Sequence, residues 1–141
     1  MIREDLDNLV IQTRRDILRM VHAVNSGHPG GSLGCVEFFV TLYNRIIKHD
    51  GDNNSKDMFI LSNGHISPVY YSTLARSGYF EIKELGTFRK INSRLQGHPT
   101  THEKLEGIRV STGSLGQGLS VAIGAASRKN NNSGHSRVIY E

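Results

Sequence analysis

The sequence predicts an α/β fold, in which helices pack in layers against a sheet of parallel strands. Two observations predict this class. Segments with apolar residues at helical spacing alternate along the chain with short apolar runs of strand length. Glycine- and asparagine-rich turns separate the two kinds of segment, and strands that alternate with helices usually pair in parallel. A length of 141 residues suits one domain or a piece of a larger one.

Helices are expected wherever apolar residues recur every three to four positions. The first is typical: Asp5 and Asp7 lie near its start and Arg14 and Arg19 further along, which suits the helix dipole. For the third, Ser67 is expected at the N-cap and Pro68 at the first helical position. The expected helices span residues 5–24, 35–46, 67–78, 82–89 and 119–126.

Strands are expected at three short apolar runs, of which the first reads as buried on both faces. The expected strands are residues 58–61, 108–111 and 138–140. The connections between elements are rich in Gly, Asn, Asp and Ser, or simply polar and irregular. The expected loops are residues 27–32, 49–55, 92–107, 112–118 and 130–134. The chain stops at or just after the last strand, so the fold is expected to be cut short there.

Composition excludes several functional classes. A single cysteine, Cys35, rules out an internal disulfide framework, and its place on an apolar helix face predicts a core position. The net charge is +4 and the isoelectric point about 9.4, but no basic patch gathers, so no nucleic-acid partner is expected. No apolar run approaches the roughly 20 residues of a membrane span, and no signal peptide precedes the first helix. We expect a reduced, cytoplasmic protein that binds neither nucleic acid nor membrane.

Histidine placement carries most of the chemical information. Four of the seven histidines directly follow glycine, and His28 and His98 also precede proline. Proline drives the preceding residue out of the α region, so Gly-His-Pro presents an imidazole from a restricted, non-helical backbone. His65 follows an expected strand, where ligands of parallel sheets collect. Because imidazole titrates near neutrality, these three rings are candidates for proton transfer or binding. The remaining glycine-flanked or helical histidines are expected to be ordinary turn or helix residues: His22, His49 and His135.

Two further patterns leave alternatives open. The glycine-rich turn 113–118 precedes a helix and either cradles a phosphate or simply allows a tight turn and close helix packing. His98 and His102 have the i, i+4 spacing of a helical metal pair, but Pro99 and the intervening threonines oppose a helix, and no glutamate lies between them. We therefore assign no metal ligand.

Taken together, four motifs resemble the transketolase family. They are Ser-Gly-His-Pro-Gly-Gly-Ser-Leu-Gly at 26–34, Leu-Ser-Asn-Gly-His-Ile-Ser-Pro at 61–68, Gln-Gly-His-Pro at 96–99 and Ser-Thr-Gly-Ser-Leu-Gly-Gln-Gly at 111–118. They occur in the family's order, and the resemblance runs from the first helix to the end, so it covers nearly the whole chain. Many full-length members have proline at the position of Ser114. With serine there, this sequence resembles the N-terminal subunits of split transketolases. Residues 1–141 are thus expected to be the N-terminal part of a diphosphate-binding domain, with a three-layer thiamine-diphosphate-binding fold.

The resemblance implies a thiamine-diphosphate-dependent enzyme of the pentose phosphate pathway. Such enzymes transfer a two-carbon ketol unit from a ketose phosphate to an aldose phosphate. By matching the family's motifs, His28 and His98 are expected to be catalytic residues that contact the sugar substrate and support proton transfer. His65 is expected to contact the cofactor near its diphosphate. The segment Gly113, Ser114 and Leu115 is expected to touch the aminopyrimidine side of the cofactor, which replaces the phosphate cradle as our interpretation of this turn.

The resemblance also implies what these residues lack. Family members hold Mg²⁺ or Ca²⁺ and the diphosphate through a Gly-Asp-Gly segment and a later asparagine, which would lie beyond residue 141. The glutamate that activates the cofactor comes from a pyrimidine-binding domain. We therefore expect a C-terminal, pyrimidine-domain subunit as partner, in a homodimer or heterotetramer, and no turnover by the 141 residues alone. Two alternatives remain: a related enzyme such as a deoxyxylulose-phosphate synthase or another sugar-pathway homologue, and a non-catalytic fragment or interaction module.

Overall fold

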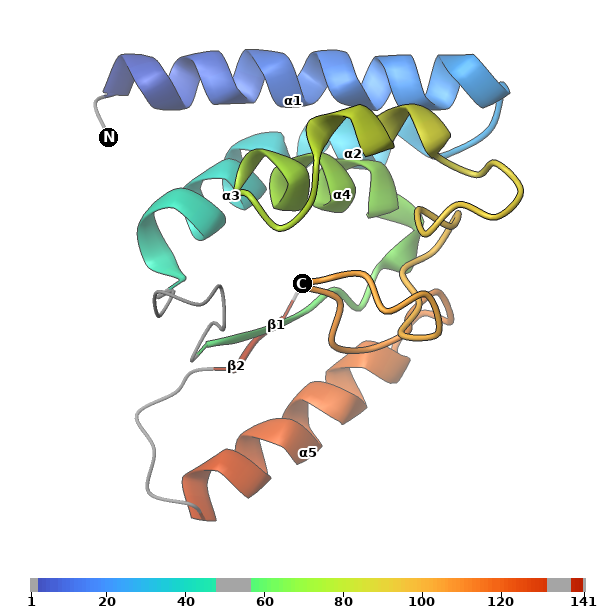
Figure 1. Ribbon diagram of the computed structural model, residues 1–141. Coiled ribbons are helices and arrows are strands. Elements are labelled where there is room, and N and C mark those ends of the chain that lie inside the picture. The colour runs from blue at the N-terminus through green and yellow to red at the C-terminus, as the bar shows by residue number, and fades with distance from the viewer. Residues whose placement is uncertain (1–2, 48–56, 132–137, 141) are drawn as a thin grey trace.

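Helices cover both sides of a short parallel sheet in the computed structural model (Figure 1). The structure describes residues 3–47, 57–131 and 138–140. One helical layer contains α1 (Arg3–Val24), α2 (Pro29–Gly34), α3 (Val36–Thr41) and α4 (Ser67–Arg76), and α5 (Gln117–Asn131) lies on the opposite side of the strands. Three shorter helical turns complete the described part: the π-helical η1 (Leu42–Ile46) and the 3₁₀ turns η2 (Gly64–Ile66) and η3 (Ile82–Thr87). The α/β fold class predicted from the sequence is confirmed.

The sheet joins two strands that are far apart in the sequence. Strand β1 (Met58–Ile60) pairs in parallel with β2 (Val138–Tyr140), with Phe59 opposite Ile139. Phe59 and Ile60 are buried, as expected for a strand covered on both faces. The parallel pairing requires a crossover, and the crossover contains α4 and α5. Because the chain turns into η2 directly after β1, the carboxyl end of that strand leads straight to His65.

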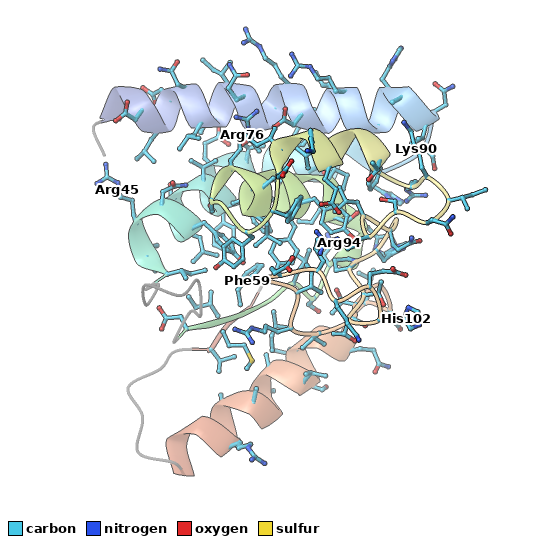
Figure 2. All side chains as sticks on the ribbon, viewed as in Figure 1. Arg45, Phe59, Arg76, Lys90, Arg94 and His102 are labelled. Atoms are coloured by element: carbon cyan, nitrogen blue, oxygen red, sulfur yellow. The ribbon has the colours of Figure 1, made fainter. Side chains whose placement is uncertain are left out.

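Helix α4 is the centre of the core. Every residue from Ser67 to Ala75 is buried, and the helix packs against α1, α2 and α3. Between α3, β1 and α4 lies a cluster of edge-to-face and tilted rings: Phe39, Tyr43, Phe59 and Tyr70, with centroid distances of 5.3 to 6.2 Å. Aromatic rings in such arrangements gain about 0.5–1.5 kcal/mol per pair beyond the burial of their surface. Figure 2 shows Phe59 in the interior, below the helical layer.

A buried ion pair ties α1 to α4. The Asp16 carboxylate is 95% buried; it accepts a hydrogen bond from the Ser72 hydroxyl at 2.8 Å and one from the Arg76 guanidinium at 2.6 Å. Arg19, one turn further along α1, lies 3.5 Å away on the surface side. Because the carboxylate has both a charged and a neutral donor, its burial is compensated.

Several of the predicted elements are wrong in detail. Residues 108–111 form no strand: Gly107 takes a left-handed backbone (φ 89°) and the Ile108 amide donates to Leu105, so the segment bonds within its own turn. The expected loop 27–32 becomes helical from Pro29, whose fixed φ favours a helical first turn. Ser67 does not cap α4, because η2 leads directly into the helix and places Ser67 inside it.

Two further corrections concern where helices break or end. The helix expected over 35–46 is broken into α3 and a π-helical turn, where the Ile47 amide reaches the Leu42 carbonyl five residues back. Helix α5 extends to Asn131, into the loop expected at 130–134. The rest of that loop, and the whole of the loop expected at 49–55, lie outside the described residues, as do His49 and His135. Cys35 is half-buried against the core, at the junction of α2 and α3.

The described helices differ in length or hydropathy from membrane-spanning helices. None of the helices in the described ranges combines the length and the apolar character needed to span a membrane.

Candidate functional site

Three imidazole rings lie in contact at one edge of the helical layer. The His28 and His65 ring centroids are 4.9 Å apart, and those of His65 and His98 are 4.7 Å apart. Both pairs meet nearly at right angles, with interplanar angles of 88° and 85°. The three glycine-preceded histidines singled out from the sequence are therefore brought together from segments separated by more than thirty residues. We call them the histidine cluster.

His28 and His65 are placed by short helical turns that face each other. His28 is the N-cap of α2, with the non-helical backbone that the following proline imposes (φ −123°, ψ 73°), and its side chain is exposed. His65 lies in the 3₁₀ turn η2 and is half-buried. The two turns approach closely at Gly31, where a Cβ would lie 2.8 Å from the Ile66 side chain. Only glycine at position 31 therefore allows α2 to approach η2 this closely without displacing Ile66.

His98 is held through the backbone of the irregular segment in which it lies. The Ser67 hydroxyl of α4 donates to the Gly97 carbonyl at 2.8 Å, and the Tyr71 hydroxyl donates to the Gln96 carbonyl at 2.9 Å. Two side chains of the most buried helix thus fix the two peptide groups before His98. A segment without regular structure is in this way given a defined backbone position.

The glycine-rich turn packs against the histidine cluster. The Thr112 amide donates to the Pro99 carbonyl at 3.1 Å, which joins the turn to the residue after His98. At Gly113 a Cβ would lie 3.0 Å from the His98 ring. Ser114 and Leu115 follow and are exposed, Leu115 at 67%. The predicted cofactor-binding segment 113–115 therefore lies beside the predicted catalytic ring of His98.

Burial and neighbouring charges affect the protonation of His98. The pKa of His98 is lowered from its ordinary value, first by burial, and then by the charges of His65, Arg89 and His28. A lowered pKa leaves the His98 ring neutral near pH 7, so that one of its nitrogens can accept a proton or a hydrogen bond. Chemically, the cluster offers several neutral or ionisable nitrogens to one polar, hydroxyl-bearing ligand.

The remaining histidines of the described ranges stay outside the cluster. His102 projects from the edge of the molecule (Figure 2), with a side chain that is 90% exposed, and its ring lies near Glu103. The segment from His98 to His102 is a turn rather than a helix, so the i, i+4 pair is not formed. His22 lies in the last turn of α1 and is exposed. Within residues 3–47, 57–131 and 138–140, no group of three acidic, cysteine or histidine side chains has the arrangement of a metal site.

Sequence reasoning missed two residues that shape the site. Gly64 has the backbone of residues 112 and 113 against its Cα, and the Arg89 side chain lies between the segments that carry His28 and His98. A glycine before His65 gave a partial signal for the first. Nothing local marks Arg89, because its contacts come from distant parts of the chain.

Comparisons with known proteins agree on one family. Residues 6–137 match the model described as "Transketolase, thiamine diphosphate binding domain". Transketolase from Buchnera aphidicola (subsp. Acyrthosiphon pisum) is 41% identical over 128 residues, which is 88% of this chain and 19% of that protein. Transketolase 2 of Escherichia coli is 39% identical over 130 residues, or 89% of this chain and 19% of its own length. The chain thus spans about a fifth of the length of these relatives.

Solved structures give the same answer. The transketolase of Campylobacter jejuni superposes with a TM-score of 0.80 at 33% identity, covering 93% of this chain and 21% of that one. A Pichia stipitis transketolase in complex with sedoheptulose-7-phosphate superposes with a TM-score of 0.76 at 27% identity, covering 96% and 21%.

Proposed function

Because this chain belongs to the transketolase family, through its thiamine-diphosphate-binding domain, we propose that it supplies the histidine side of a ketol-transfer site. The protein that contains it would transfer a two-carbon ketol unit from a ketose phosphate to an aldose phosphate. The observation that carries the proposal is the contact of His28, His65 and His98 beside Gly113. The Pichia stipitis complex supports sedoheptulose-7-phosphate as a donor to test first.

The residues present fit one side of the cofactor. Gly113 lacks the Cβ that would press on His98, which lets the backbone of the turn lie against the imidazole ring. The exposed Leu115 adds an apolar surface suited to a heterocyclic ring. In this proposal His65 and residues 113–115 hold thiamine diphosphate. When bound, the cofactor supplies the thiazolium carbon that takes up the two-carbon unit and the ring system that accepts its electron pair.

The chain's own contribution would be orientation and proton transfer. His28, exposed at the N-cap of α2, and His98, half-buried beside Gly113, would hydrogen-bond the hydroxyls of the sugar. The lowered pKa of His98 leaves its ring ready to take a proton from such a hydroxyl at neutral pH. His65 touches both rings and would limit the orientations open to each of them.

Completing the site requires groups that the described residues do not supply. A diphosphate needs a divalent cation, here Mg²⁺ or Ca²⁺, and no metal-binding group occurs among those residues. We propose that the cation is held outside them and that a pyrimidine-binding domain, on a partner subunit of a split transketolase, closes the site in a homodimer or heterotetramer. Large apolar side chains exposed along α5 and the preceding turn support such a covering surface: Leu115, Leu119, Val121 and Ile123. The cytoplasm and the pentose phosphate pathway are part of the same proposal.

Ketol transfer by the complete protein, with its partner subunit, tests the proposal. Replacing His28 or His98 with alanine should lower kcat about 100-fold or more, the range of a lost acid–base group. His102→Ala is the matched control, because that ring is exposed and outside the cluster. Wild-type turnover by both cluster variants would contradict the assigned roles.

The alternatives give different results in the same experiment. A synthase-like or other sugar-pathway homologue would reject every ketose phosphate in a panel of donors while still needing His28 and His98 for its own reaction. A non-catalytic module would release no heat when the complete protein is titrated with thiamine diphosphate and Mg²⁺ in a calorimeter.

A further inference from the structure

Arg89 lies between the two Gly-His-Pro segments. It follows η3, and its guanidinium Nη1 donates a hydrogen bond to the Ser26 hydroxyl at 3.0 Å, two residues before His28. On the other side the guanidinium packs on Gly97, the residue before His98. A Cβ at Gly97 would lie 2.8 Å from Arg89 Cζ. The Arg89 side chain therefore contacts Gly97, directly before His98, and Ser26, two residues before His28.

The Phe88 ring and a backbone hydrogen bond hold Arg89 in place. Its Cζ lies 5.5 Å from the centroid of the Phe88 ring, a cation–π distance, and Phe88 is buried. The same ring lies 3.8 Å from the position of a Cβ at Gly27, directly before His28. The Arg89 amide donates to the Leu95 carbonyl at 2.8 Å, which closes the loop that leads to Gly97.

The backbone of Arg89 takes a conformation that is unusual for a residue with a side chain. Its φ is 56°, in the left-handed region that non-glycine residues rarely adopt. Its Nε is buried and has no hydrogen-bond partner among the residues that the structure describes. Strained backbone and unsatisfied buried donors gather where function, rather than stability, fixes a side chain.

We propose that Arg89 is a positioning residue that fixes the Ser26–His28 and Gly97–His98 segments relative to each other, and so sets the spacing of the two outer rings of the histidine cluster. The inference rests on the ketol-transfer function proposed above. It adds a residue that does not itself need to touch substrate or cofactor: Arg89 acts through its contacts with Ser26 and Gly97.

Electrostatics supports this placement. The guanidinium charge of Arg89 lowers the pKa of His98. Its effect is smaller than those of burial and of the His65 charge, and larger than that of the His28 charge. Arg89 therefore acts on His98 in two ways that can be separated. Its planar guanidinium packs against Gly97, directly before His98, and its charge lowers the pKa of the ring. Lysine keeps the charge and loses the planar fork, and glutamine loses the charge.

The test uses the complete protein and two readouts. The first is the kcat and KM of ketol transfer. The second is the pKa of each histidine, measured from the pH dependence of exchange of the imidazole Cε1 hydrogen by mass spectrometry, which needs no cofactor. The variants are Arg89→Lys, Arg89→Gln and the control Lys90→Gln, which removes the same charge from an exposed neighbour.

We expect Arg89→Lys to lower kcat about tenfold with a smaller change in KM, since sub-ångström displacement of reacting groups is costly. Its His98 pKa should stay low. Arg89→Gln should lower kcat at least as far and raise the His98 pKa toward its ordinary value. Lys90→Gln should change neither readout. Wild-type kcat together with an unchanged His98 pKa in Arg89→Gln would overturn the proposal.

A milder variant keeps the proposal testable if Arg89→Gln fails to fold. Ser26→Ala removes the acceptor of the guanidinium and leaves Arg89 in place. It should lower kcat several-fold, and combined with Arg89→Lys the loss should be smaller than the product of the two single losses, because both remove one contact. Independent, multiplicative losses would overturn the positioning role.

The two proposals fail in distinguishable ways. If the protein transfers no ketol unit, the proposed function fails, and the His98 pKa in Arg89→Gln still decides whether Arg89 acts on the cluster. If His98→Ala abolishes turnover but every Arg89 variant behaves as wild type, the function stands and the positioning role is wrong.

Discussion

Replacing Gly64 with alanine should displace the glycine-rich turn from the histidine cluster. Gly64 lies directly before His65, in η2, and is buried against the turn. A Cβ there would lie 2.5 Å from the Thr112 carbonyl oxygen and 2.8 Å from the Gly113 amide nitrogen. Both neighbours are backbone atoms, so no side-chain rotation relieves the overlap.

The size of the effect follows from these distances. The added methyl would sit about 0.9 Å inside the 3.4 Å at which ordinary van der Waals contact begins, so η2 and the turn must separate by nearly that amount. Overpacking of this kind costs about 1–3 kcal/mol, and a rigid backbone on both sides favours the upper half of that range. A shift approaching 1 Å between His65 and Gly113 should also lower kcat about 100-fold.

Two measurements on the complete protein check this prediction, with Gly86→Ala as the control. Gly86 is exposed in η3 and has open space around the position of a Cβ, so alanine there should be neutral or stabilising by up to about 1 kcal/mol. Amide hydrogen exchange should accelerate in residues 59–66 of Gly64→Ala alone, and kcat should fall in that variant alone. Exchange rates and turnover equal to those of the control would refute the close backbone contact on which the reasoning depends.

Three further predictions concern stability. Asp16→Asn should lower the free energy of unfolding by about 3–5 kcal/mol in a denaturant titration, because it leaves the Arg76 charge without its buried partner. The control Arg14→Gln breaks an exposed ion pair with Glu37 and should cost at most about 1 kcal/mol. Tyr71→Phe should cost about 1 kcal/mol by removing a donor to the backbone before His98. Because the pKa of His98 is lowered in the folded chain, the unfolded chain binds more protons between that lowered value and the ordinary value of 6.5. Stability should therefore fall as the pH drops through this window, and His98→Gln should flatten this part of the stability–pH curve.

Most of the helical layer could be predicted because its determinants are local. The apolar spacing of α1 and the proline near the start of α4 are visible within one or two turns, although Ser67 does not cap that helix. The strand expected at 108–111 was wrong for the complementary reason. Its apolar residues suggested a strand, but Gly107 turns the backbone and the Ile108 amide donates to the Leu105 carbonyl. This segment therefore forms a turn instead of pairing with another strand.

The candidate site divides in the same way. Proline and glycine restrict their neighbours directly, so the sequence indicates that His28 and His98 leave regular structure. The motif resemblance assigned His28, His65 and His98 to substrate and cofactor contacts. The fold adds that the rings of His28 and His98 both lie next to His65, at centroid distances of 4.9 and 4.7 Å. Their catalytic roles, and the cofactor contacts of residues 113–115, stay predictions.

Arg89 shows why part of such a site escapes sequence reasoning. Its acceptor, Ser26, is 63 residues away, and its contact with Gly97 depends on a hydrogen at a Cα rather than on a recognisable side chain. No periodicity or spacing relates these positions; only the folded chain brings them together. The candidate catalytic histidines are marked in the sequence by the unusual backbone around them, whereas the proposed positioning residue is marked only by its contacts in the fold. For this chain, the decisive measurements are therefore the pKa of His98 and the kcat in the Arg89 variants, which show whether the charge and the planar guanidinium of Arg89 act on the His98 ring.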